Sequence, residues 1–174
     1  MSGLASGLLH PLMVPAHVLA LVALGLCIGL QARAAQIAAG AGFALGVAGG
    51  LAAIAFAARP TSAIDLLLTA TLLSGALAAA VLPLPSLVSA LLAGLTGAAL
   101  GMDSPPQAIS LTVATMTLIG TGIGACLIFV VATVAAGLLR GLWKGIPLRI
   151  LGSWCAASAL LVLALRFARG LMFE

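Results

Sequence analysis

The amino-acid sequence predicts an all-α membrane protein, a polytopic bundle of about six transmembrane helices. Of the 174 residues, 64% are hydrophobic and only 6% are charged, whereas soluble domains carry about 25% charged residues. The hydrophobic residues fall into blocks of roughly 20, the number of helical residues that spans ~30 Å of hydrocarbon. A transmembrane β-barrel would instead alternate apolar and polar residues along each strand, and the sequence shows no such alternation.

The first three helices are delimited by prolines and charged residues. Pro11 suits the first turn of a helix because its φ angle is already fixed. The second helix is expected between Arg33 and Arg59. In the third helix, Asp65 is predicted as a first-turn residue, where a negative charge is favoured by the helix dipole. Pro83 ends this helix, since proline cannot continue one.

Prolines also delimit the last three helices. Pro85 precedes the fourth helix, and the pair Pro105 and Pro106 follows it. The fifth helix ends before Arg140, and the sixth begins at Pro147. The six predicted ranges are 11–31, 36–58, 63–82, 86–102, 107–139 and 147–168. The connections between them are short, so we expect residues 1–174 to form one transmembrane domain, and any water-soluble partner to be another chain.

Two features of the helices leave alternatives open. Pro15 lies near the start of the first predicted helix and removes one backbone hydrogen bond, which fits either an ordinary helix start or a functional break. Glycines recur at four-residue spacing, which allows helices to approach closely in lipid. The expected use of these glycines is packing within the bundle, and the alternative is a seam between copies in a homo-oligomer. The clearest repeats are Gly42, Gly46 and Gly50, then Gly97 and Gly101, then Gly120 and Gly124.

The charges predict an orientation in the membrane and argue against nucleic-acid binding. The net charge of +4 comes from seven basic and three acidic residues spread thinly along the chain, a pattern that indicates topology. The first and fifth loops lie on the same side of six alternating helices and carry four of the basic residues: Arg33, Arg140, Lys144 and Arg149. These loops are predicted to be cytoplasmic in a bacterial inner membrane, with both termini periplasmic. Arg59, Arg166 and Arg169 then lie on the periplasmic side.

His10 and His17 are the only histidines, and they are candidate metal ligands. A separation of seven residues is two turns of a regular helix, which places both imidazoles on one face. Two imidazoles can bind a divalent transition metal, although such ions usually take more ligands. The alternative is that both rings bond to backbone groups or to interfacial lipid.

The remaining polar residues point away from enzymatic chemistry. Asp65 and Asp103 both lie near predicted helix ends, where water can reach a carboxylate at little cost. No serine lies in a nucleophile-elbow motif, and no orienting acid accompanies a serine and a histidine in sequence. We therefore expect that the protein is not an enzyme and holds no resident cofactor.

Three segments resemble the HupE/UreJ family of small membrane proteins. Residues 10–25, HPLMVPAHVLALVALG, are similar to the opening signature of that family. Residues 96–103, TGAALGMD, and 114–123, ATMTLIGTGI, are similar to two later stretches in the same order. The resemblance implies a bundle of about six helices that carries nickel or cobalt across the membrane, in association with hydrogenase or urease systems.

The sequence departs from the family pattern at several ligand positions. His10 and His17 are retained, and Asp103 stands where the family has glutamate, so these three are the predicted metal residues. Histidines or acids of the family are replaced at Ala16, Thr96, Ala98, Leu100 and Ile119. Two functions follow: a permease for nickel, cobalt or another small solute, or a non-transporting accessory or scaffold subunit of a larger membrane complex.

Overall fold

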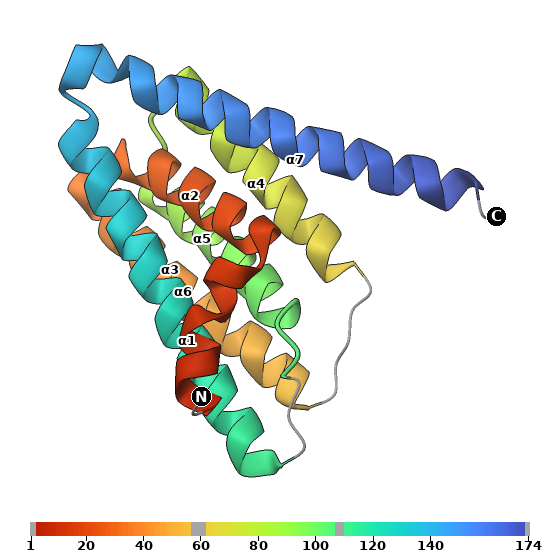
Figure 1. Ribbon diagram of the computed structural model, residues 1–174. Helices are drawn as coiled ribbons and strands as arrows, with labels where there is room; N and C mark the ends of the chain where they lie inside the picture. Colours follow the sequence, from red (N-terminus) through yellow and green to blue (C-terminus); the bar gives the residue numbers. More distant parts are fainter. Residues whose placement is uncertain (1–2, 57–61, 107–109, 173–174) are drawn as a thin grey trace.

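The structure, a computed structural model, confirms the all-α fold and describes residues 3–56, 62–106 and 110–172. Over these ranges it contains seven α-helices, one short 3-10 helix and no strand (Figure 1). The helices are α1 Gly3–Met13, α2 Pro15–Gly29, α3 Arg33–Ala55, α4 Ala63–Ala80, α5 Ser86–Met102, α6 Leu111–Leu139, the 3-10 helix Leu142–Gly145 and α7 Ile146–Met172.

The lengths and surfaces of the helices are those of a multi-pass integral membrane protein. Helices α3, α4, α6 and α7 are each long and apolar enough to cross a membrane, and α1 with α2 makes a fifth candidate if the bent pair is one span. The apolar helix α5 is shorter, at 17 residues. Large apolar side chains such as Leu45 and Leu138 are about three-quarters exposed. A lipid environment accepts such a surface, whereas water does not.

Most of the predicted helix boundaries agree with the structure to within a few residues. The predicted range 86–102 coincides with α5, and 63–82 is close to α4. Helix α3 begins at Arg33, so this arginine is a first-turn residue and not part of a loop. The start of the fifth predicted helix, at 107–109, and Arg59 lie outside the described residues.

The first predicted helix, 11–31, is corrected by the structure, because it begins at Gly3 and is two helices. Pro11 accordingly lies in the last turn of α1 and not in a first turn. Helices α1 and α2 meet at Val14 and are bent by 72°. Val14 has an extended backbone, with φ −101° and ψ 109°, and Pro15 is the first residue of α2. Steric contact with a following proline disfavours helical geometry, and proline itself has no N–H to donate. Pro15 therefore starts a helix and also follows a break in the span, and a functional use of that break stays a prediction.

The core of the bundle is built around α2, which lies in the middle of Figure 1. Ten of its fifteen residues are buried, and it touches each of the other α-helices. Leu21, Leu24 and Ile28 are completely enclosed. Beside them Phe43 of α3 stacks on Phe129 of α6, with ring centroids 4.6 Å apart. The helix that carries His17 is thus mostly buried and lies at the centre of the bundle.

Neighbouring helices pack through their glycines, which confirms packing within the bundle as the use of the four-residue repeats. A Cβ atom at Gly46 of α3 would overlap the carbonyl of Gly94 in α5, and one at Gly7 of α1 would overlap the carbonyl of Thr117 in α6. The same holds at Gly42, Gly50, Gly97, Gly101, Gly120 and Gly124. Close main-chain approach of this kind supplies the van der Waals contact that holds helices together in lipid.

The bundle has two chemically different ends. At the first, here called the Arg33 end, α2 and α6 finish beside the start of α3. Gln31 closes this end: its Nε2 donates to the carbonyls of Cys27 and Leu82, and its Oε1 accepts from the N–H of Leu84. The predicted grouping of basic residues is found here, with Arg33, Arg140, Lys144 and Arg149 all near helix ends on this side.

The opposite end, here called the Asp103 end, carries the two described acids. Asp65 lies in the first turn of α4, as predicted, and also accepts a hydrogen bond from Nε of Arg166 in α7. Asp103 caps the C-terminus of α5. Acidic groups therefore gather at the end of the bundle that is remote from Arg33.

Candidate functional site

The break between α1 and α2 brings the two histidines together. His10 lies in the last turn of α1 and His17 in the first turn of α2. Their ring centroids are 5.6 Å apart, in an edge-on arrangement. Along one straight helix, seven residues would separate them by about 10.5 Å. The prediction that both rings lie on one face of a single regular helix is thus wrong. The rings lie on two helices and approach each other across the bend.

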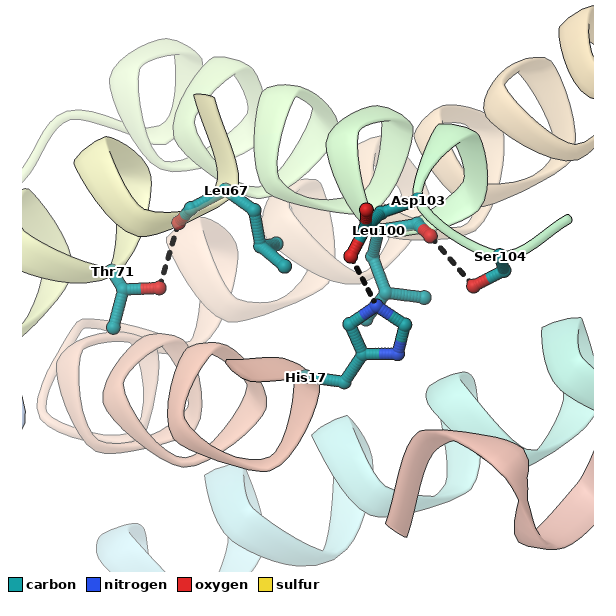
Figure 2. A network of polar contacts seen from close by, with 6 residues as sticks. All are labelled: His17, Leu67, Thr71, Leu100, Asp103 and Ser104. Atoms are coloured by element: carbon teal, nitrogen blue, oxygen red, sulfur yellow. Dashed lines mark hydrogen bonds and ion pairs between the residues drawn. The ribbon is translucent and has the colours of Figure 1, made fainter. Parts of the chain in front are cut away.

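Asp103 joins this pair from α5. Its Oδ2 lies 3.1 Å from Nε2 of His17. Figure 2 marks this contact with a dashed line. The His17 side chain is fully buried, whereas the Asp103 side chain is 25% exposed. A carboxylate can only accept hydrogen bonds. The contact therefore places the proton of His17 on Nε2 and leaves a lone pair on Nδ1, on the other side of the ring.

Two ring nitrogens of the cluster remain without a partner. Nδ1 of His17 and Nε2 of His10 are both buried, and neither has a hydrogen-bond partner among the described residues. Buried polar atoms are nearly always satisfied in folded proteins. A histidine whose other nitrogen donates to a carboxylate is also the usual form of a metal-binding histidine. Nδ1 of His17 is thus suited to an electron-pair acceptor such as a metal ion, and Nε2 of His10 is suited to one in the tautomer that carries its proton on Nδ1.

A cavity of about 310 Å³ leads to His10 from the Asp103 end. It lies between α1, α6 and residues 104–106, and its polar lining includes Ser6, Ser104, Thr117 and Thr121. The hydroxyls of Thr117, Thr121 and Ser104 each donate to a carbonyl one turn earlier. Their oxygens can still accept a hydrogen bond or approach a cation. The cavity is therefore a polar route to His10 through an otherwise apolar bundle.

The structure assembles the three predicted metal residues but gives them different positions. His10 and His17 each keep one buried ring nitrogen that has no partner among the described residues, whereas Asp103 contacts His17 and is placed to orient its imidazole. In the part of the chain that the structure describes, no three His, Cys, Asp or Glu side chains are grouped closely enough to hold a metal ion. Within the described ranges the cluster has two unpartnered ring nitrogens, and their use as metal ligands stays a prediction.

The positions where the resemblance implies lost histidines fall into two groups. Thr96 and Leu100 are completely buried, and Leu100 lies near the His17 ring in Figure 2. Ile119 is 47% exposed and lines a different cavity, between α3 and α6. A ligand at 100 would lie close to the cluster, while one at 119 would face away from it.

Sequence reasoning missed the hydroxyls that line the cavity. Ser6 lies one turn before His10 on α1, and Thr117 and Thr121 are one turn apart on α6. Polar residues at four-residue spacing on an apolar helix were the signal that could have indicated a polar face.

No protein family, characterised protein or solved structure was found to match this chain.

Proposed function

We propose that the chain is a bacterial inner-membrane transport protein that passes a divalent transition-metal cation of the nickel and cobalt class by His10 and His17. The observation that carries this proposal is the pair of buried, unpartnered imidazole nitrogens at a broken helix. Discontinuous helices commonly form the substrate sites of transporters, because they free polar groups at membrane depth. The resemblance of residues 10–25 to the HupE/UreJ signature supports the same substrate class.

Charge favours access of the cation from the Asp103 end. Asp65 and Asp103 lie at this end together with the hydroxyl-lined cavity, and Arg166, also at this end, has its charge paired with that of Asp65. The Arg33 end presents four basic residues, which would repel a cation. If the Arg33 end is cytoplasmic, as the positive-inside rule predicts, the cavity opens toward the periplasm. We therefore propose uptake rather than export.

The small number of ligands predicts weak binding. Removing a divalent ion from water costs far more than two neutral imidazoles return. The remaining coordination positions would have to be filled by water or by hydroxyl oxygens in the cavity. Weak binding suits a passage site, since conduction requires that an ion can leave as well as enter.

A second candidate function is a non-transporting subunit that docks against a larger membrane complex. The absence of a third metal-ligating side chain among the described residues favours it. The exposed apolar faces of α6 and α7 would serve for contact with another membrane chain.

Nickel uptake distinguishes the two functions. Cells that lack their own nickel uptake are supplied with radioactive Ni²⁺ and express either the natural chain or the double variant His10→Ala, His17→Ala. We expect accumulation with the natural chain and a fall to the level of the empty vector with the double variant, because both free nitrogens are lost. The matched control is His10→Ala alone, for which we expect partial loss.

Equal uptake by the natural chain and the double variant would contradict the transport proposal. The amount of each protein in the membrane has to be the same for this comparison. Retention of the natural chain and the double variant in one large complex after gentle detergent extraction, with no nickel uptake by either, would favour the subunit instead.

A further inference from the structure

We propose a second binding site, for an anionic phospholipid, along the seam between α3 and α6. Its phosphate would lie at Arg33 and one acyl chain would follow the seam into the membrane. This site is independent of the histidine cluster and of the proposed transport.

The seam is an apolar groove that runs inward from Arg33. A cavity of about 190 Å³ is lined by Arg33, Gln36, Gly40 and Thr133 among others, and a second of about 640 Å³ continues from it. Val130 lines both cavities, so the two are adjoining parts of one groove. The larger part lies between the small residues of α3, Ala44, Ala48 and Ala52, and the apolar side chains of α6, Ile119, Ile123 and Leu127.

The groove exists because α3 makes its close contacts elsewhere. On one side, the glycines of α3 place its main chain against α5. Toward α6, a Cβ atom built at Gly122 would meet the Leu51 and Val47 side chains, not the α3 backbone. Helix α3 has 23 residues, or about 35 Å at 1.5 Å per residue, so the groove runs along a helix of full membrane length.

The polar groups of the groove are concentrated at the Arg33 end. Arg33 is exposed and has no ion-pair partner within the described ranges, where Asp65 contacts Arg166 and Asp103 contacts His17. A guanidinium presents planar donors that match a phosphate. In the same cavity the hydroxyl oxygen of Thr133 is buried and has no hydrogen-bond partner among the described residues. A lipid ester group, one glycerol below the phosphate, would supply that partner.

A lipid fits this distribution better than a transmembrane helix does. The groove offers a cation and a free hydroxyl at one end and an almost entirely apolar surface beyond, as required by a molecule with one polar end. Thr115 is a polar lining residue of that larger part, and its hydroxyl donates to the carbonyl of Leu111. A helix is about 10–12 Å wide and would rest on the rim of such a groove rather than fill it. It would also leave Arg33 without an anion unless it carried one at the matching depth.

Lipid binding to the purified full chain in detergent tests the proposal. Native mass spectrometry would follow the addition of phosphatidylglycerol, which is anionic, and of phosphatidylcholine, which has no net charge. We expect one phosphatidylglycerol per chain, bound about tenfold more tightly than phosphatidylcholine, with a rise in melting temperature. Arg33→Gln should weaken the binding of phosphatidylglycerol about tenfold, which removes the preference. Arg140→Gln, at the same end but outside the groove, should keep the preference.

A glycine pair tests the acyl chain separately from the charge. A Cβ atom at Gly40 or at Gly49 of α3 would meet nothing within 4 Å, so we expect both positions to accept leucine without a main-chain clash. Gly40 lines the smaller cavity, and Gly49 lines neither part of the groove. Gly40→Leu should therefore weaken phosphatidylglycerol binding, and Gly49→Leu should not.

Three results would overturn the proposal. Equal binding of the two lipids would mean that the chain binds bilayer lipid without specificity for the anionic headgroup. Equal effects of Gly40→Leu and Gly49→Leu would show that the groove is not occupied by a chain. The same stabilisation by inorganic phosphate would show that Arg33 binds an anion without the groove. None of these results depends on nickel, so they leave the transport proposal to its own test.

Discussion

Replacing Gly46 with leucine is expected to prevent the chain from folding. A Cβ atom at this position would overlap the Gly94 carbonyl and lie 3.0 Å from the amide nitrogen of Ala98. The atoms that the new side chain would meet belong to the main chain of α5, so no side-chain rearrangement can relieve the overlap. We expect a loss of about 4 kcal/mol or more, the range in which a single substitution unfolds an ordinary domain.

The control for Gly46→Leu is the same substitution three residues along α3. Gly49→Leu places leucine where nothing lies within 4 Å of its Cβ. It should be neutral or slightly stabilising, because glycine is a poor helix former by about 1 kcal/mol. Both variants would be extracted in detergent and compared by size-exclusion chromatography and thermal unfolding. A monodisperse Gly46→Leu protein that melts with the natural chain would refute the proposed packing of α3 on α5.

Replacing Asp103 with asparagine is expected to weaken nickel binding by about 10- to 100-fold, the usual effect of removing the carboxylate behind a metal-binding histidine. Asparagine has nearly the same shape, so His17 should stay in place. Its neutral amide, however, bonds more weakly than a carboxylate and therefore holds the His17 imidazole less firmly. Calorimetric titration of the purified chain with Ni²⁺ measures the change, provided that the affinity tag contains no histidine.

Asp65→Asn is the matched control for Asp103→Asn. Asp65 lies at the same end of the bundle and contacts Arg166 rather than a histidine. The variant should bind nickel as the natural chain does, and the loss of this half-exposed ion pair should cost little stability. If both variants weakened binding equally, the effect would come from the general charge of this end. If Asp103→Asn bound normally, Asp103 would have no role in positioning His17.

Much of the fold could be predicted from the sequence because membrane helices obey a simple length requirement. The apolar blocks and the prolines at 83, 85, 105 and 106 located α4 and α5 closely. The glycine repeats indicated close helix packing, although not which helices are paired. Which helices pack together depends on contacts between residues far apart in the chain, such as Gly46 and Gly94. The spacing of glycines along one helix does not indicate its partner helix.

The candidate site was only partly predictable. His10 and His17 stood out as the only histidines, but their approach depends on the extended backbone at Val14 and on a bend of 72°. Pro15 made a break possible without determining its angle. The contact from His17 to Asp103 joins residues 86 positions apart, so only the family resemblance had grouped them. The permease function and the metal stay predictions.

The central claim is that the break in the first span presents two imidazoles to one cation. X-ray absorption spectroscopy of the purified chain loaded with Ni²⁺ tests it most directly, because the spectrum counts imidazole rings bound to the metal. We predict two imidazole nitrogens with oxygen atoms in the other positions, and no imidazole signal in the double variant His10→Ala, His17→Ala. A spectrum without imidazole, or one unchanged in the double variant, would contradict the account.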